Sequence, residues 1–281
     1  MNEVVFRDAS TGFIVGHEGK MLRTDDAGAS WTVVSLPTSN DLYDIHLVGD
    51  EEIFLVGNQV LLKSTNDGSS WSELTLPQSK DWRTIWFFDS DKGLIGGSDM
   101  TILKTDDGGR NWLDRSPNNS SSMPLNACWF ISEDAGYMVG NGKIFLTSSG
   151  GAVWVETFAF DVANSSILFE SITDIQYIDA DHGFLCGSQG LLASESSIWI
   201  NKALPVRNGY IDIKGPNGVY TGTSTFADSS VVMVSSNAGI FWSEESFPKT
   251  VRDVSDAARV DELHAVVITE RGEIFRRQDR F

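Results

Sequence analysis

Short apolar segments bounded by glycine recur along the whole chain. Residues 12–16 read Gly-Phe-Ile-Val-Gly, and comparable segments lie at residues 53–57, 93–97, 136–140, 183–187, 218–222 and, more weakly, 265–269. Their last positions run from Gly16 to Thr269, so six steps cover 253 residues, or about 42 residues a step, the length of one four-stranded propeller blade. We call these last positions the glycine column.

Each repeat also predicts strands on both sides of this segment. An apolar strand precedes it, as at residues 43–47 and 83–87, and another follows it, as at residues 20–23 and 101–104. Turns rich in Gly, Asp, Asn and Pro separate these runs, and none of the runs has a helical period of useful length. The pattern therefore indicates short strands throughout.

An octet with a fixed order of residue types separates the third and fourth strands. Residues 105–112 read Thr-Asp-Asp-Gly-Gly-Arg-Asn-Trp; residues 24–31 and 64–71 repeat this order, and residues 147–154 and 235–242 are decayed copies. Asp or Asn can accept backbone N–H groups of its own turn, Gly supplies positive φ, and Trp buries a large apolar area. We call this octet the corner box and expect structural roles for Asp26, Gly28, Trp31, Asn66, Gly68, Trp71, Asp107, Gly109, Trp112, Gly151 and Trp154.

These repeats predict an all-β fold, a seven-bladed β-propeller of four-stranded blades in a single domain over residues 1–281. The last blade is expected to have three strands, because residues 272–276 match a third strand and the sequence ends shortly afterwards. The expected blades span approximately residues 1–38, 39–78, 79–120, 121–159, 160–203, 204–248 and 249–281.

A three-stranded last blade would expose the edge of its third strand. Arg276, Arg277 and Arg280 lie on or beside this edge, and charge at an edge discourages unwanted strand pairing. Ordinary edge protection is one interpretation. The other is that a partner strand or an acidic segment docks there.

The formal net charge of −18 makes a nucleic-acid or anionic-membrane partner unfavourable, since such surfaces attract an excess of Lys and Arg. The N-terminal residues do not have the pattern of a signal peptide, and no apolar run approaches the roughly 20 residues that span a bilayer. We therefore expect a soluble protein, cytoplasmic or virion-associated, without membrane insertion. Cys128 and Cys186 lie in apolar runs, where a free thiol fills core space.

The segment from Gly12 to Trp31 carries a family resemblance. Its order of Gly-Phe-Ile-Val-Gly, two residues, Gly-Lys-Met-Leu-Arg and a complete corner box resembles the repeat of the photosystem II assembly and stability factor propellers, a branch of the Asp-box (BNR) repeat proteins. The resemblance covers essentially the whole chain and is weaker in repeats five to seven. It implies a seven-bladed propeller that holds protein partners and is not an enzyme. The same repeat also occurs in bacterial and phage proteins.

Sialidases, which also carry Asp-boxes, suggest an enzymatic alternative. Their site combines an arginine triad, a Tyr nucleophile with a Glu partner and an Asp acid/base. Candidates on or near inner strands that could converge are Arg7, Arg83, Arg207, Arg252, Tyr43, Tyr177 and Tyr210. The Phe-Arg-Ile-Pro signature of bacterial sialidases is absent, so we expect no catalytic residue. The four histidines have no paired spacing, so no metal site is expected either, and no cofactor.

The topology predicts where a binding surface would lie. Corner boxes mark one face of a propeller, so the loops after the glycine column and the connections between blades form the other face. Trp82 precedes its strand and could stack on a sugar or grip a peptide, whereas Trp86 and Trp129 occupy matching positions that also suit packing between blades. The candidate binding residues are His17, Asn58, Trp82, Arg83, Asp99, Asn141, Gln189, Arg207 and Arg271.

Three functions are compatible with these features. The first is a non-catalytic scaffold propeller that docks onto protein partners in a larger assembly. The second is a structural or receptor-binding accessory component of a phage tail or capsid. The third is a sialidase-like glycan-binding or glycoside hydrolase protein, so a glycan is a possible ligand.

Overall fold

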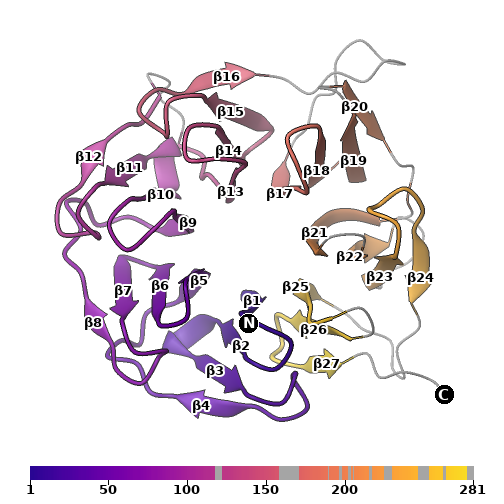
Figure 1. Ribbon diagram of the computed structural model, residues 1–281, viewed down its shortest axis with the longest axis horizontal. Helices are drawn as coiled ribbons and strands as arrows, with labels where there is room; N and C mark the ends of the chain where they lie inside the picture. Colours follow the sequence, from indigo (N-terminus) through magenta and orange to yellow (C-terminus); the bar gives the residue numbers. More distant parts are fainter. Residues whose placement is uncertain are drawn as a thin grey trace. The chain divides into compact units, whose positions relative to one another are not determined.

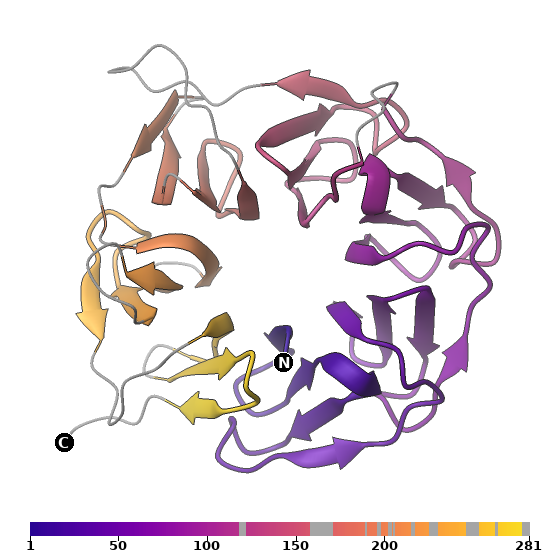
Figure 2. The same cartoon turned by 180° about the vertical axis from the view of Figure 1, so that it is seen from behind.

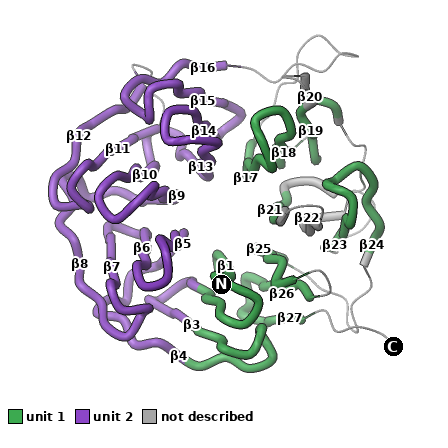
Figure 3. The backbone as a smooth tube through the Cα atoms, in the orientation of Figure 1, with its two compact units in different colours: residues 1–14, 22–32, 158–281 green, residues 15–21, 33–157 purple. Residues whose placement is uncertain are grey.

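The computed structural model describes residues 1–117, 122–157, 171–188, 190–195, 198–201, 204, 206–214, 217–224, 230–245, 253–261 and 264–276. These residues form antiparallel sheets in which consecutive strands are neighbours (Figure 1). The chain divides into two compact units (Figure 3). Unit 1 comprises Met1–Ile14, Leu22–Thr32 and Phe158–Phe281, and unit 2 comprises Val15–Met21 and Val33–Thr157.

The first four sheets have four strands each, and both views show their up-and-down order (Figures 1 and 2). Single 3-10 turns, η1 (His17–Gly19) and η2 (Ser98–Met100), follow β2 and β10. The strands are β1 (Glu3–Phe6), β2 (Gly12–Val15), β3 (Met21–Thr24), β4 (Thr32–Val34); β5 (Leu42–Val48), β6 (Glu52–Gly57), β7 (Val60–Ser64), β8 (Ser72–Glu73); β9 (Trp82–Phe87), β10 (Gly93–Gly97), β11 (Ile102–Thr105), β12 (Leu113–Asp114); β13 (Ala127–Phe130), β14 (Gly136–Gly140), β15 (Lys143–Thr147) and β16 (Val155–Thr157).

The remaining described residues form two further four-stranded sheets and one sheet of three strands, all in unit 1. Their strands are β17 (Ile172–Tyr177), β18 (His182–Gly187), β19 (Gly190–Glu195), β20 (Ile198–Asn201); β21 (Val206–Lys214), β22 (Asn217–Ser224), β23 (Ser230–Ser235), β24 (Ser243–Glu245); β25 (Val254–Arg259), β26 (Ala265–Thr269) and β27 (Ile274–Arg276).

The prediction of an all-β propeller with four-stranded blades is supported, but the predicted count of seven blades is wrong. Six of the described sheets are four-stranded blades, and the described residues after β24 contribute only the three-stranded sheet β25-β26-β27. The register of this sheet follows that of the second sheet, because pairing of Val267 with Phe275 matches pairing of Leu55 with Leu62. In the sequence, Arg277 therefore takes the place of Ser64, the hydroxyl residue that opens the second corner box.

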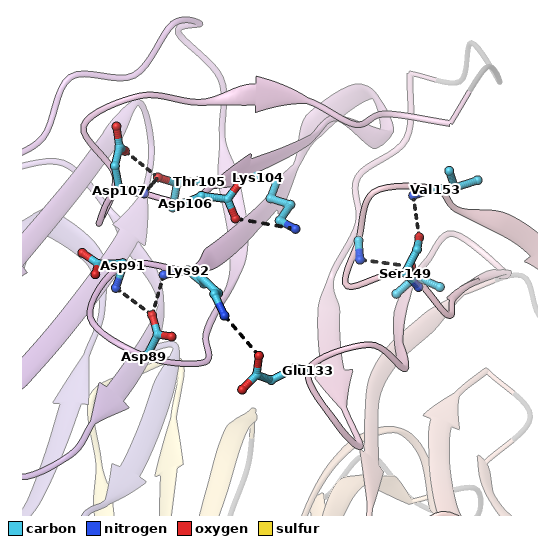
Figure 4. A network of polar contacts seen from close by, with 12 residues as sticks. Asp89, Asp91, Lys92, Lys104, Thr105, Asp106, Asp107, Glu133, Ser149 and Val153 are labelled. Carbon is cyan, nitrogen blue, oxygen red and sulfur yellow. Dashed lines mark hydrogen bonds and ion pairs between the residues drawn. The ribbon is translucent and has the colours of Figure 1, made fainter.

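The corner boxes fold through their own side chains. Thr105 Oγ accepts the N–H of Gly109 at 3.0 Å, while Asp107 Oδ1 accepts the N–H of Asn111 at 2.8 Å. Trp112 then donates its Nε1–H to the carbonyl of Gly109 at 3.0 Å. Ser149 replaces the acid in the fourth box and accepts the N–H of Val153 at 3.0 Å (Figure 4). Either oxygen can close the turn, which explains why decayed boxes keep the same backbone.

The glycine column marks a tight crossing of two backbones. A Cβ atom at Gly57 would collide with the carbonyl oxygen of Asp41, and one at Gly97 would collide with that of Asp81. Each of these carbonyls belongs to the residue before a first strand. Glycine at this position therefore lets the end of the second strand pack against the residue that precedes the first strand. Any larger residue would force the two backbones apart.

Aspartates connect neighbouring sheets within each unit. In unit 2, Asp44 on β5 accepts the N–H of Ile85 on β9 at 2.8 Å. In unit 1 the same connection runs from Asp174 to Ile211 at 2.9 Å, from Asp212 to Arg259 at 2.6 Å and from Asp256 to Val4 at 2.8 Å. Each carboxylate bonds to an N–H of the first strand of another sheet, so backbone pairing and side-chain bonding together hold the blades.

Candidate binding site

The predicted binding residues divide between the two units. His17, Asn58, Asp99 and Asn141 lie in unit 2, in turns between second and third strands. Arg271 lies in unit 1, where its Nε contacts Asp253 Oδ2 at 2.6 Å. The others in unit 1 are less defined: the backbone of Arg207 belongs to β21, and Gln189 lies outside the described residues, as do Arg252, Arg277 and Arg280.

Hydrogen bonds connect the turns of unit 2 into a continuous surface. We call it the loop rim and define it as residues 17–20, 38–43, 57–60, 78–83 and 97–101. Asn40 Nδ2 donates to the carbonyl of Asn58 at 2.9 Å, and the N–H of Gln59 donates to the carbonyl of Lys80 at 3.0 Å. Lys80 in turn contacts Asp99 Oδ2 at 3.0 Å. The loop rim therefore brings His17, Asn58 and Asp99 onto one bonded framework.

The backbone of the loop rim repeats one unusual conformation. Glu18, Gln59 and Asp99 have φ of 58°, 57° and 57°, and Asn141 in the next turn has φ of 47°. Left-handed conformations cost L-residues free energy and persist where the surrounding bonds determine them. Here the N–H of Glu18 donates to Asp41 Oδ1 at 2.9 Å, so the connector between sheets fixes the turn.

Tyr43 and Arg83 form the best-defined contact in the loop rim. The guanidinium carbon of Arg83 lies 4.9 Å from the centre of the Tyr43 ring, within the range of a cation–π interaction. Both residues are partly exposed. Burial raises the pKa of the Tyr43 phenol, and the negative charge of Asp81 raises it further. The phenol therefore stays protonated, while Arg83 Nε is enclosed and has no hydrogen-bond partner among the described residues.

The Trp82 side chain does not contribute to this surface although its backbone lies within the loop rim, which corrects the sequence interpretation. Its side chain is 0% exposed and lies in a core cluster with Phe54, Ile85 and Phe87. Trp82 pairs with Gly97 in the register in which Leu42 pairs with Gly57. The position opposite the glycine column is therefore a core position, and here it is filled by an indole.

A second group of aromatic side chains lies toward the other ends of the first strands of unit 2. The ring of His46 lies 4.9 Å from that of Trp86, which lies 5.2 Å from that of Trp129. All three residues are partly exposed. His46 Nε2 donates to the carbonyl of Phe87 at 2.9 Å, and burial lowers the pKa of His46 to about 4. This neutral aromatic row spans three sheets.

The corner carboxylates are poorly suited to acid–base catalysis. Bonds from the Ser30 hydroxyl and the Ser30 backbone lower the pKa of Asp26 to about 2. A bond from the Asn111 side chain, followed by one from its backbone, lowers the pKa of Asp107. A general acid needs a pKa near the working pH. These groups therefore act as turn acceptors.

No group of three or more His, Cys, Asp or Glu side chains in the described part of the chain is placed to hold a metal ion. Both cysteines are buried and neither forms a disulfide, and burial raises the pKa of the Cys186 thiol well above its usual value. None of the described helices is both long and apolar enough to cross a membrane.

Sequence reasoning missed the connector residues of the loop rim. Asp41 pairs with His17 at 3.2 Å, and Lys80 binds both Asp99 and the hydroxyl of Thr101. The sequence position of Asp41 and Asp81 could have identified this part of the chain, because both residues stand immediately before the first strand of a sheet. Aligning the residues that begin these two strands places Trp82 with Leu42 in the core and Arg83 with Tyr43 on the rim.

Comparisons with known proteins were made against this geometry. A family model described as photosynthesis system II assembly factor YCF48 matches residues 1–80 and 71–160. No curated protein sequence matches the chain significantly.

Several solved structures share the fold. One described as YCF48 bound to D1 peptide is similar with a TM-score of 0.72 and 15% identity, covering 99% of this chain and 91% of that one. YCF48 from Cyanidioschyzon merolae gives 0.67 and 16%, covering 98% and 94%. A GH74 xyloglucanase from Xanthomonas campestris gives 0.76 and 13%, covering 97% of this chain and 51% of that one. At such identities the likeness concerns the fold alone.

Proposed function

Because the chain belongs to the photosynthesis system II assembly factor YCF48 family, we propose that it is a non-catalytic, protein-binding propeller that docks onto a larger protein assembly. A member of this family has been solved with a bound D1 peptide. We extend that mode of action, recognition of a polypeptide segment, to this chain.

The Tyr43–Arg83 pair carries the proposal. A half-buried aromatic ring beside a guanidinium is the kind of anchor that dominates protein interfaces, where Tyr and Arg are enriched. Arg83 is partly exposed, so its guanidinium could donate to a peptide carbonyl or carboxylate of the partner. Burial keeps the Tyr43 phenol protonated, so it can donate a hydrogen bond to the bound segment.

The charges around the Tyr43–Arg83 pair make it selective for one orientation of the bound segment. The chain carries a net charge of −18, and Asp41, Asp81 and Asp99 border the same rim. A partner that carries negative charge is attracted to the few cations of the rim, of which Arg83 lies beside the Tyr43 ring. We therefore expect Arg83 to set the orientation of the bound segment, with the Tyr43 ring providing contact area.

The test is equilibrium binding of a fluorescent D1 peptide to the full chain, measured by anisotropy. We expect Arg83→Ala to weaken binding by about tenfold or more, which corresponds to about 1.4 kcal/mol. Arg110→Ala is the matched control, because Arg110 is an exposed arginine in a corner box, away from the loop rim. Circular dichroism of both variants checks the fold.

Two results would contradict the proposal. Equal affinities of wild type and Arg83→Ala would remove the loop rim from the interface. If the wild type does not bind the D1 peptide, affinity capture from the native host with wild-type and Arg83→Ala baits tests the surface independently of that ligand. Identical captured proteins would then refute the role of Arg83.

A glycan ligand is the second candidate, favoured by the row of His46, Trp86 and Trp129. Exposed aromatic faces stack on sugar rings, and the row crosses three sheets. We expect any glycan binding to be lost in Trp86→Ala and retained in Arg83→Ala. Titration with neutral and acidic oligosaccharides followed by calorimetry separates this site from the loop rim.

A further inference from the structure

The outer edge of β27 differs from the corresponding edges of the six four-stranded blades. In each of those blades the third strand pairs with a fourth, whereas β27 is the last strand of its sheet among the described residues. Fourth strands here are short, from two residues in β8 to four in β20. A segment of a few residues is therefore enough to complete a blade.

The hydrogen-bond pattern identifies which groups of β27 face outward. The N–H of Thr269 donates to the carbonyl of Glu273 at 3.1 Å, and bonded and non-bonded pairs alternate along an antiparallel ladder. Phe275 is therefore the next residue bonded to β26. The backbone N–H and C=O groups of Ile274 and Arg276 point away from β26, toward the open side.

The complete blades show what these positions do when a fourth strand is present. By register, Ile274 corresponds to Leu61 and Ile102. The carbonyl of Leu61 accepts the N–H of Leu74 at 2.9 Å, and the carbonyl of Ile102 accepts the N–H of Arg115 at 2.8 Å. The outward groups of β27 thus match groups that receive the outer strand elsewhere.

Arg276 supplies a charge at the same edge. The basic residues at the corresponding positions are paired: Arg23 contacts Asp25 at 2.8 Å, Lys63 contacts Glu52 at 3.1 Å and Lys104 contacts Asp106 at 3.7 Å. No described residue accepts a hydrogen bond from Arg276 Nε, which is enclosed, but the residue as a whole is partly exposed. The exposed part of the guanidinium favours an anionic acceptor.

Apolar side chains flank this edge on both faces of the sheet. Ile274 packs partly buried against the cluster that contains Val266 and Ile268, and Phe275 packs partly buried against the cluster that contains Val267. An added strand would cover more of both side chains, which stabilises strand addition through apolar burial as well as hydrogen bonds.

We propose that the outer edge of β27 binds a short, extended, acidic segment of a partner polypeptide as a fourth strand. The segment runs antiparallel to β27, pairs with the backbone of Ile274 and Arg276, and places a carboxylate opposite Arg276. A partner polypeptide is favoured over a second copy of this chain, because two chains of charge −18 repel each other. This edge belongs to unit 1, whereas Tyr43 and Arg83 belong to unit 2, so its test is independent of the loop rim.

The first experiment measures amide hydrogen exchange by nuclear magnetic resonance on the full chain. The probe is the synthetic peptide Thr-Val-Glu-Val-Thr, and the control replaces its Glu with Lys. We expect the Glu peptide to slow exchange at Ile274 and Arg276 by about fivefold or more at about 1 mM, the weak regime of short peptides. The Lys peptide should leave both amides unchanged.

A charge exchange provides the second variant. Arg276→Glu retains a side chain at an edge position and should reverse the preference, so that the Lys peptide protects Ile274 and the Glu peptide does not. Arg110→Glu, at an exposed arginine of a corner box in unit 2, is the matched control and should keep the wild-type preference. Both variants are checked for folding by their amide spectra.

Three outcomes would overturn the proposal. Amides of Ile274 and Arg276 that are already protected without peptide would mean that another part of this chain covers the edge. A dimer in light scattering that disappears in Arg276→Glu would assign the edge to a second copy. If the Glu and Lys peptides slowed amide exchange equally, or if neither slowed it, the edge would not be a binding site for an acidic segment.

Discussion

Replacement of Trp82 by alanine tests the assignment of this residue to the core. Trp82 is 0% exposed and lies among Phe54, Ile85 and Phe87 in one apolar cluster. As a surface residue, the indole could be removed with little loss of stability. As the residue opposite Gly97, it fills the space between two sheets, and its removal leaves a cavity.

The expected cost follows from the burial. A buried tryptophan removes up to about 250 Å² from water, which at about 25 cal/mol per Å² gives an upper bound of about 6 kcal/mol. Trp82 Nε1 has no hydrogen-bond partner among the described residues, and an unpaired buried N–H costs about 1–3 kcal/mol. Truncation relieves that cost, so we expect Trp82→Ala to lower the free energy of unfolding by about 3–4 kcal/mol.

The assay is urea unfolding of the full chain followed by circular dichroism, with thermal unfolding as a second measure. For a chain of this length about 3–4 kcal/mol corresponds to a fall in Tm of about 6–8 °C. Trp86→Ala is the matched control, because Trp86 lies on the same strand and is only partly buried. We expect it to cost about 2 kcal/mol or less.

The comparison between Trp82→Ala and Trp86→Ala decides whether Trp82 is a core residue. A loss below about 1 kcal/mol for Trp82→Ala is smaller than any cavity of that size allows and would refute the core assignment. Reduced binding of a partner without reduced stability would return Trp82 to the surface. If Trp82→Ala and Trp86→Ala lowered the free energy of unfolding equally, the difference in burial between the two side chains would have no effect on stability.

Three further outcomes follow from the contacts described above. Thr105→Val leaves the N–H of Gly109 without its acceptor and should lower the free energy of unfolding by about 1–3 kcal/mol in urea unfolding; an unchanged midpoint would contradict the role of the hydroxyl. Gly97→Ala drives a Cβ atom into the Asp81 carbonyl and should cost more than the same change at exposed Gly49, around which a Cβ meets nothing, in thermal unfolding. Burial raises the pKa of Asp174 to about 6, so the folded chain binds this proton more tightly and its stabilising effect is lost as pH rises through 6. Between about pH 4.5 and about pH 7, the free energy of unfolding of the wild type should therefore fall by about 2 kcal/mol more than that of Asp174→Asn. Equal falls in the two proteins would refute the raised pKa of Asp174.

The all-β class and the four-stranded repeat could be predicted because both depend on local chemistry. A corner box closes with side chains no more than a few residues apart, as Thr105 and Asp107 show, so its sequence is sufficient to specify it. The glycine column is also local in sequence, although its cause, a close carbonyl from the preceding connector, becomes visible only in the structure.

The number of complete blades could not be obtained by counting glycine columns. A glycine column marks only the pairing of a second strand with its neighbours, so it counts three-stranded and four-stranded sheets alike. The last column lies in β26, whose sheet has three strands among the described residues, so the column count of seven exceeds the six four-stranded blades.

The candidate site was predicted in part for a similar reason. Asn58 follows from its position in the repeat, because the turn after the glycine column is where a binding loop was expected, whereas Arg83 lies at the start of the first strand β9. The burial of Trp82 can be inferred only from its alignment with Leu42. The size and amphipathic character of its side chain alone suggested an exposed residue that binds a sugar or a peptide. The pairing of Tyr43 with Arg83 joins two sheets, and no pattern within one repeat encodes it.

The bond between Asp256 and the N–H of Val4 spans 252 positions of sequence. On a ribosome the first strand emerges long before its acceptor, and at about 5–20 residues per second the interval is roughly 13–50 s. During that time Val4 and Phe6 lack the part of their apolar cluster that Ala258, Val266 and Ile268 supply. In a nascent chain the first strand should therefore complete its packing only after translation has passed these residues.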